Sequence, residues 1–269
     1  MLEAQPKLRG LFTSAVVLVC FFALDRFDGQ LYQALRQSDG GMAQHLEVLI
    51  YLYLPWLLVP SALAMLIVGP KNVLSALGLN GSVLVGLVAG LLLTLPMLGT
   101  LAVTGEWVTP AEPGRVFLRS SLFPGFFEEV LYRAFLFGFL FRYAGWGFLP
   151  AALIGALIFG AAHLYQEDDL NRAIGVFAIT GLGGVWFAWL FAEWKFNLWV
   201  PIALHTLMNL WWGLFSVSDS ALGPMPANLA RLAVIILSVV VTIIVANRRG
   251  GLIVKGRAWL FGGPASPKG

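Results

Sequence analysis

The chain has 269 residues, of which 59% are hydrophobic and only 12% are charged. A soluble globular domain carries about 25% charged residues, so this composition excludes an ordinary soluble domain and points to a lipid bilayer as the solvent. The net charge of +3 does not indicate a nucleic-acid partner, because the basic residues lie at loop edges and in the tail, where membrane topology requires them. The single cysteine, Cys20, excludes an internal disulfide and a thiolate metal cluster.

Long apolar runs follow one another along the chain. The first, Leu11–Leu24, comes after Lys7 and Arg9 and has no small-x-small cleavage motif behind it, so it is predicted to be an uncleaved first span rather than a signal peptide. A membrane-spanning helix needs roughly 20 mostly apolar residues, and runs of this length favour helices over the short strands of a barrel. The predicted spans are residues 9–25, 47–68, 81–103, 117–141, 146–165, 173–193, 197–216 and 229–247.

These runs predict an all-α integral membrane protein, a single bundle of about eight transmembrane helices with a polar intramembrane cavity. Residues 1–116 are assigned to the first three helices and residues 117–216 to a catalytic core of helices four to seven. Residues 217–269 are assigned to the last helix and a basic tail with a flexible end. Glycines within the spans are expected to let neighbouring helix backbones approach closely.

Two loops are longer than the others, and the loop charges predict an orientation. Residues 25–45 are expected to include a surface helix near 30–37, and residues 104–115 to form an irregular connection. With both termini on one side, that side carries Lys7, Arg9, Lys71, Arg142, Lys195, Arg248, Arg249, Lys255, Arg257 and Lys268. The other side carries fewer basic residues, namely Arg26, Arg36, Arg115, Arg119 and Arg172. Both termini are therefore predicted to be cytoplasmic, in the cell membrane.

Few ionisable side chains lie well inside the spans, and at that depth each is costly and a candidate for function. In the fourth span, Glu129 and Arg133 are four residues apart, share a helix face and are expected to pair. On an α-helix the adjacent Glu128 points about 100° away from Glu129. A structural ion pair explains Glu129 and Arg133 but leaves Glu128 alone, which makes Glu128 the candidate general base.

The other polar groups at this depth are His163 in the fifth span and His205 with Asn209 in the seventh. A lone intramembrane histidine is usually an interhelical hydrogen-bonding group, but the helical rise places all three residues in the same half of the membrane as Glu128. Amide hydrolysis needs an activated water, a hydrogen-bond donor for the oxyanion and a proton for the leaving amine. A carboxyl group, two imidazoles and an amide can supply these functions together.

The order Glu-Glu-x-x-x-Arg, Phe-x-x-x-His and His-x-x-x-Asn on three apolar helices resembles the CAAX protease and bacteriocin-processing (CPBP, or Abi) family, which includes the type II CAAX prenyl proteases. The resemblance covers about residues 120–216 and rests on Glu128, Glu129, Arg133, Phe159, His163, His205 and Asn209. It implies an intramembrane endopeptidase in which Glu128 activates a water and His163 holds that water. It also implies that His205 and Asn209 stabilise the oxyanion, with Glu129, Arg133 and Phe159 in supporting roles.

No cofactor is expected, although Zn²⁺ held by Glu128, His163 and His205 stays open as an alternative, because three such ligands suffice for a catalytic zinc site. The expected partners are the lipid bilayer and a peptide or membrane-protein substrate, with or without an attached lipid, and no nucleic acid. Two other functions stay open. One is a proton-coupled transporter or channel with Glu128 and the histidines as a relay, and the other is an inert membrane scaffold or immunity-type protein.

Overall fold

A computed structural model of the chain describes residues 4–36, 42–109 and 113–262. It is about 80% helical and contains no β-strand in these ranges, which confirms the predicted all-α membrane fold. In chain order the helices are α1 (Ala4–Arg36), α2 (Met42–Glu47), η1 (Val48–Tyr53), α3 (Leu54–Val68), η2 (Pro70–Asn72), α4 (Val73–Ala76), α5 (Val83–Thr104), η3 (Arg115–Leu122), η4 (Pro124–Phe137), α6 (Gly138–Arg142), α7 (Phe148–Ala162), η5 (Leu164–Gln166), α8 (Leu170–Glu193), α9 (Trp199–Leu214), α10 (Met225–Arg248) and η6 (Gly256–Trp259).

Helices occupy all eight predicted spans, but only six of the described helical segments are both long and apolar enough to cross a membrane. The segment from η3 to α6 is long enough but not apolar enough to meet this criterion, because it carries several charged residues, including the Glu-Glu pair. Helix α9 falls short because its 16 residues extend only about 24 Å, against a hydrocarbon core of about 30 Å. The two helices that depart from the membrane-span pattern are those that carry Glu128, Glu129 and His205.

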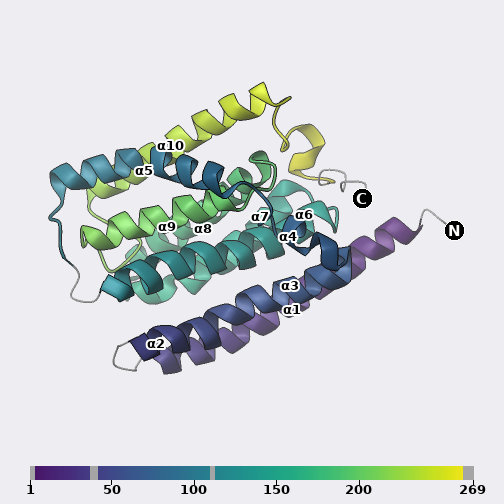
Figure 1. Cartoon of the computed structure of the whole chain (residues 1–269), viewed down its shortest axis with the longest axis horizontal. Coiled ribbons are helices and arrows are strands. Elements are labelled where there is room, and N and C mark those ends of the chain that lie inside the picture. The colour runs from purple at the N-terminus through teal and green to yellow at the C-terminus, as the bar shows by residue number, and fades with distance from the viewer. Residues whose placement is uncertain (1–3, 37–41, 110–112, 263–269) are drawn as a thin grey trace.

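The η3–η4 segment lies at the centre of the bundle. Helices α1, α3, α7, α8 and α9 all contact η4. Helices α1 and α3 lie side by side along one flank, and α5, α9 and α10 lie on the opposite flank (Figure 1). The turn between η4–α6 and α7 reverses the chain, so the two helices pack antiparallel, with Phe137 against Phe148 and Tyr132 against Phe159. Residues of η4 are therefore packed between five other helices.

Small residues set the distances between the helices, as predicted. A Cβ on Gly90 of α5 would lie 2.6 Å from the Cβ of Ala203 on α9. A Cβ on Gly184 of α8 would lie 3.3 Å from the Cα of Ala156 on α7. Membrane helices lack a hydrophobic drive to associate with each other, so such close van der Waals contact at small residues is a main source of their packing energy.

The connections differ in part from expectation. Helix α1 continues to Arg36, so residues 30–36 extend the first helix and do not form a separate surface helix. Residues 106–109 are irregular, as predicted for this loop, and residues 110–112 lie outside the described part of the chain.

The tail after α10 folds back onto the bundle. We call residues 250–262 the C-terminal strap. The Glu193 carboxylate at the end of α8 accepts hydrogen bonds from the backbone N–H groups of Ile253 and Val254, each over 2.8 Å. Trp259 packs edge-on against Phe148, with ring centroids 5.3 Å apart. The flexible end predicted for the tail falls on residues 263–269, outside the described residues.

Candidate active site

Glu128 and Glu129 lie on η4, within a π-helical stretch that runs from Arg115 to Phe137 with an interruption at Phe123. π-Helical hydrogen bonds join residues five apart, so the turn is wider than an α-helical turn and adjacent side chains diverge by less than 100°. The expectation of an α-helix here was wrong, and with it the inference that the two carboxylates point to different places. Both approach the same imidazole.

That imidazole belongs to His205 of α9. Its Nδ1–H donates to Oε1 of Glu129 over 2.8 Å, and its Nε2 lies 3.9 Å from Oε2 of Glu128. Phe187 of α8 stacks on the imidazole with ring centroids 5.6 Å apart. The histidine is therefore held between two adjacent carboxylates and against one aromatic ring, which leaves its side chain 12% exposed.

Gly125 allows α9 to come this close to η4. A Cβ at this position would overlap the Oγ1 of Thr206 and lie 2.8 Å from the Thr206 backbone nitrogen. Because Thr206 follows His205 directly and Gly125 lies one turn before Glu129, the glycine sets the separation of the carboxylate and the imidazole. The lack of a side chain at Gly125 thus allows the contact between Glu129 and His205.

The predicted pairing of Glu129 with Arg133 is confirmed. Nη1 of Arg133 lies 3.2 Å from Oε1 of Glu129, and the two side chains are 2% and 0% exposed. Oε2 of Glu129 and Nε of Arg133 are buried without a hydrogen-bond partner among the described residues. Glu128 differs from its neighbour, because its side chain is 14% exposed. Of the two carboxylates, Glu128 is the one that an incoming molecule can reach.

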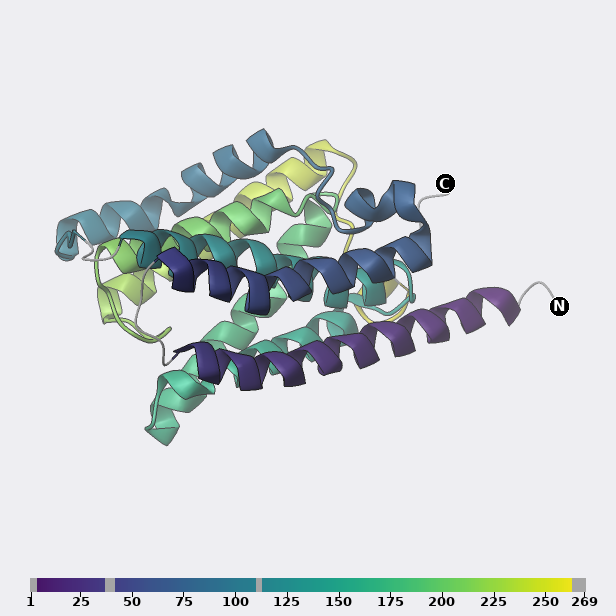
Figure 2. The same ribbon diagram turned by 60° about the horizontal axis from the view of Figure 1, so that its bottom comes forward.

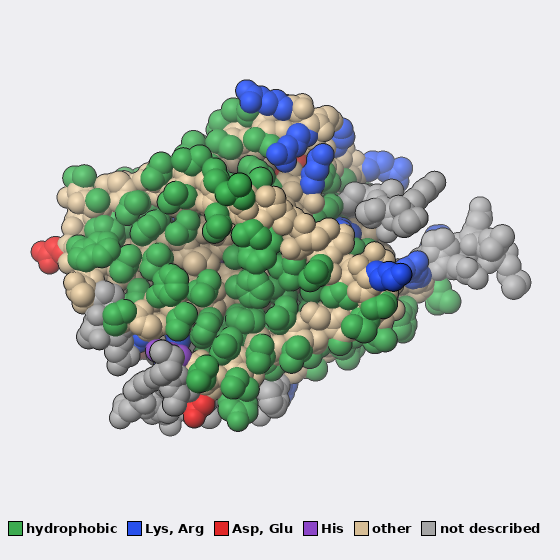
Figure 3. Space-filling model, viewed as in Figure 1, with side chains coloured by type: hydrophobic (Ala, Val, Ile, Leu, Met, Phe, Trp, Pro, Cys, Tyr) green, Lys and Arg blue, Asp and Glu red, His purple; other side chains and the backbone are tan. Residues whose placement is uncertain are grey.

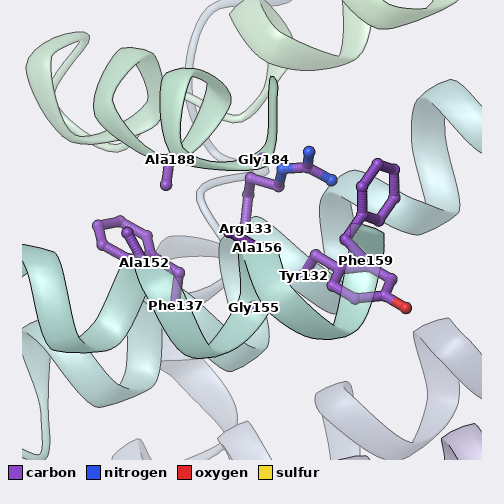
Figure 4. Close-up of a pocket in the computed structure, with 9 residues that line it drawn as sticks. All are labelled: Tyr132, Arg133, Phe137, Ala152, Gly155, Ala156, Phe159, Gly184 and Ala188. Atoms are coloured by element: carbon purple, nitrogen blue, oxygen red, sulfur yellow. The ribbon is translucent and has the colours of Figure 1, made fainter. Parts of the chain in front are cut away.

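Arg133 is enclosed by aromatic rings and borders a small cavity (Figure 4). Its guanidinium carbon lies 4.7 Å from the ring centroid of Phe159 and 5.3 Å from that of Phe187. The cavity has a volume of about 10 Å³ and is lined by Tyr132, Arg133, Phe137, Ala152, Gly155, Ala156, Phe159, Gly184 and Ala188. This space suits about one water molecule and is far too small for a peptide, so it belongs to the packing behind the site.

His163 ends α7 at the level of Glu128. Its Nδ1–H donates to the carbonyl oxygen of Phe159 over 2.7 Å, which leaves Nε2 as the acceptor in the neutral ring. Phe159 contacts Tyr132, with ring centroids 4.9 Å apart. Glu128 lies about one turn before Tyr132 on η4, and His163 lies about one turn after Phe159 on α7. Because the two helices are antiparallel, both steps run in the same direction from the Tyr132–Phe159 contact, so Glu128 and His163 lie at a similar level. The His163 imidazole lies beyond ion-pair distance of either glutamate, since neither pair falls within 4.0 Å.

Asn209 lies one turn after His205 on α9 and is half-buried. Its amide makes no hydrogen bond to other residues that the structure describes. Of the residues predicted for the site, Glu128, Glu129, Arg133 and His205 therefore form one contact cluster. His163 and Asn209 lie at its margin without touching it directly.

The cluster lies at the boundary between a dense and a more open half of the bundle. Every residue from Glu129 to Arg142 is buried, whereas residues 121–128 alternate between buried and partly exposed and residues 115–120 are all partly or fully exposed. On α9, residues 200–204 are buried and every residue from His205 to Leu214 is half-buried. The α7–α8 end of the bundle also extends away from the ends of η3 and α9 (Figure 2). The polar site is thus closed on the side of α6 and more accessible from the opposite end.

The donors do not fit a zinc site as they are arranged. In the described ranges, no group of three or more His, Cys, Asp or Glu side chains is placed to hold a metal ion. Ligands that share a zinc ion at about 2 Å must lie within about 4 Å of one another. Glu128 and His205 meet this condition, but His163 does not approach either glutamate that closely.

Three residues of the site were not singled out in the sequence. Gly125 follows a proline directly before the Phe-Phe-Glu-Glu run, and this break in an apolar helix is a signal for close packing. Tyr132 is four residues after Glu128 and so shares its side of the helix. Phe187 had no distinguishing signal, because it is one of 20 phenylalanines in the chain.

A helical bundle with two carboxylates, a guanidinium and an imidazole buried between its helices defines a membrane protein with an intramembrane polar site. Residues 110–211 match the family model of the type II CAAX prenyl endopeptidase Rce1-like proteins. The match includes every candidate site residue and supports the resemblance to the CAAX protease (CPBP) family that the motifs indicated. No curated protein and no solved structure matches the chain.

Proposed function

We propose that this protein is an intramembrane endopeptidase in which Glu128 activates the water that attacks the peptide bond. Glu129 is fully buried and is engaged by both Arg133 and His205, so it has little capacity to act on a substrate. Glu128 is partly exposed and borders the open half of the bundle. A general base must reach its proton directly or through one water, and a glutamate that takes this proton can return it to the leaving amine.

His163 is assigned the role of holding the attacking water opposite Glu128. Its Nδ1 proton is committed to the Phe159 carbonyl, so Nε2 can accept a hydrogen bond from a water. The shared level of Glu128 and His163 supports a bridging water between them. This role needs no direct contact between the two side chains.

His205 and Asn209 are assigned to the oxyanion of the tetrahedral intermediate. Since Nδ1–H of His205 is bound to Glu129, donation to an oxyanion requires a second proton on Nε2. In that form, His205 and Arg133 together balance the charges of Glu128 and Glu129, so the buried cluster carries no net charge. The Asn209 amide has no competing partner among the described residues and can supply a second donor.

The observation that carries this proposal is the clamping of His205 between the adjacent carboxylates. Glu129 fixes the orientation of the imidazole, and Glu128 remains beside Nε2 with access to the open half. Preorganised donors in a water-poor site are among the strongest contributors to catalysis of acyl transfer. The name of the matched family makes a prenylated peptide ending in a CAAX sequence the first substrate to test.

The test is cleavage of such a peptide by the purified protein, compared with Glu128→Gln. We expect the rate to fall by about 10²–10⁴-fold, the usual contribution of a general base. Helix content and the thermal unfolding temperature are expected to stay unchanged. The control is Glu106→Gln, which changes an exposed carboxylate outside the helices. Full activity of Glu128→Gln would remove Glu128 as the base.

We expect the protein to remain active after treatment with a metal chelator. Loss of activity that added zinc restores would overturn the metal-free reaction.

A further inference from the structure

Lysines and arginines gather at the end of the bundle where both termini lie, beside a broad surface of apolar side chains (Figure 3). We call this the basic end. Within the described residues it carries Lys7, Arg9, Lys71, Arg142, Lys195, Arg248, Arg249, Lys255 and Arg257, against one carboxylate, the buried Glu193. That carboxylate accepts hydrogen bonds from the C-terminal strap. The exposed charge at this end is therefore positive and suits an anionic partner.

An open groove at the basic end separates the start of α1 from the turn that joins α6 to α7. It has a volume of about 460 Å³ and is lined by Lys7, Gly10, Leu11, Ser14, Ala144 and Trp146. The four lining residues of α1 are spaced i, i+3, i+4 and i+7, so they form one stripe along that helix. The groove is therefore a seam between the first helix and the turn before α7.

The polar side chains of the groove wall bind within the groove. The Ser14 hydroxyl donates to the carbonyl of Gly10 over 2.8 Å and accepts a hydrogen bond from the Trp146 indole N–H over 3.0 Å. The helix and the turn are in contact here, because a Cβ on Gly10 would lie 2.9 Å from the carbonyl oxygen of Ala144. Both side-chain donors are thus already used. Together with Leu11, which is 68% exposed, they form a wall that suits hydrocarbon.

Lys7 supplies a positive charge at the mouth of the groove. It is the first residue of the membrane-spanning segment Lys7–Leu24, and its side chain is exposed. In the described ranges, no carboxylate lies within ion-pair distance of its ammonium group. Ser14 lies two turns further along the helix, which corresponds to about 10 Å. The groove therefore leads from a cation at the membrane surface into the apolar layer.

We propose that this groove binds one anionic phospholipid, with the headgroup phosphate paired to Lys7 and an acyl chain lying along Leu11 and Trp146. Basic pockets between membrane helices bind anionic headgroups, and tryptophan favours the level where headgroups meet hydrocarbon. A phospholipid joins an anion to a hydrocarbon chain, which matches the order of cation and apolar wall in the groove. A free phosphate would use Lys7 alone. The bound lipid fastens α1 to the turn before α7, which the strap also contacts through the bridge between Trp146 and Phe261.

Native mass spectrometry of the delipidated protein in detergent tests the charge requirement, with palmitoyl-oleoyl phosphatidylglycerol or phosphatidylcholine added in turn. We expect one tightly bound phosphatidylglycerol and weaker binding of phosphatidylcholine. Lys7→Gln should weaken phosphatidylglycerol binding by about fivefold, the equivalent of about 1 kcal/mol for one basic side chain near the membrane surface.

The matched control is Lys71→Gln, which removes an exposed lysine of the basic end that does not line the groove. It should bind phosphatidylglycerol as the unchanged protein does. Three results would overturn the proposal: no preference for phosphatidylglycerol in the unchanged protein, undiminished binding by Lys7→Gln, or equal loss in both variants. The last of these would show diffuse attraction to the basic end in place of a site.

Leu11→Trp tests the apolar wall without changing charge, because the larger side chain fills the groove. We expect it to lose the tightly bound phosphatidylglycerol, whereas Phe12→Trp should keep it, since Phe12 is 62% exposed and lies outside the groove. Added phosphatidylglycerol should also raise the thermal unfolding temperature of Phe12→Trp more than that of Leu11→Trp. Undiminished binding by Leu11→Trp would overturn the proposal. Neither measurement involves peptide cleavage, so the result is independent of the proposed function.

Discussion

Arg133 illustrates the cost of placing charge in the core of this bundle. It is 2% exposed, lies against the rings of Phe159 and Phe187, and forms an ion pair with one carboxylate, that of Glu129. The same carboxylate oxygen also holds His205. Removing one member of a buried pair leaves the other without compensation, whereas replacing both by apolar residues is often harmless to stability. The contribution of the Glu129–Arg133 pair to stability can therefore be separated from the role of Glu129 in orienting His205.

We expect Arg133→Met to lower the free energy of unfolding by about 3–5 kcal/mol, because the buried cluster then carries one negative charge that is not compensated. The double variant Arg133→Met/Glu129→Leu should recover much of that loss but remain poorly active, since His205 loses the acceptor that orients it. Unfolding in detergent and peptide cleavage measure the two effects. The matched control is Arg172→Met, at a 56% exposed arginine, which should change stability far less because exposed ion pairs contribute little. Wild-type activity in the double variant would refute the positioning role of Glu129.

At the scale of elements, the site depends on the crossing of η4 and α9. η4 is π-helical, which brings adjacent carboxylates towards one partner, and α9 is a short helix that approaches it at Gly125. π-Helical segments are uncommon and occur often at functional sites. The distances between Glu128, Glu129 and His205 are thus set by how η4 and α9 cross, and they would change if either helix moved.

Gly125→Ala should separate these two helices, because the added methyl group overlaps Thr206. We expect unfolding to become easier by about 1–3 kcal/mol, the typical cost of overpacking. Activity should fall by at least tenfold, since a misplacement of about 1 Å can cost about 10²-fold in rate. Gly99→Ala is the matched control, because nothing lies within 4 Å of its added Cβ. An equal response of both variants would contradict this account.

The loops after α7 and α9 form a second polar contact between elements. Glu167, between η5 and α8, accepts hydrogen bonds from Arg172 over 2.6 and 2.7 Å and from the Ser220 hydroxyl over 2.6 Å. The side-chain oxygen of Gln166 accepts from the backbone of Ala221 over 2.7 Å. These contacts join the loop after α7 to the loop after α9.

The hydrogen bonds from Arg172 and Ser220 lower the pKa of Glu167 from 4.5 to about 2. A lowered carboxyl pKa in the folded state means that the contact stabilises the fold fully above pH 4.5 and loses that contribution as the pH falls towards 2. Carboxyl ¹³C NMR titration should therefore give Glu167 a midpoint well below 4.5. Arg172→Gln should raise the pKa more than Ser220→Ala does. A midpoint near 4.5 in the unchanged protein would rule out the loop contact in solution.

At the scale of the whole molecule, the spans and the family were predictable because they depend on composition and on residue order. In lipid, apolar runs of about 20 residues can only form helices, and the segment that carries the Glu-Glu, His and His-Asn motifs matches the family model that these motifs suggested. The pairing of Glu129 with Arg133 followed from their spacing. The convergence of Glu128 and Glu129 on His205 did not, because it depends on a π-helical backbone in η4 that the residue order did not indicate. Helices occupy all eight predicted spans, although the charges of η4 and the 16-residue length of α9 set these two apart from the six long apolar helices.

The C-terminal strap has a consequence for how the protein is made. The buried carboxylate of Glu193 finds its two backbone donors 60 and 61 positions later in the chain. During synthesis this acid enters the bilayer with α8 long before the ribosome has added Ile253 and Val254. This contact therefore forms only after Ile253 and Val254 have left the exit tunnel, and a chain cut short after α10 would leave the buried carboxylate without these two hydrogen-bond donors.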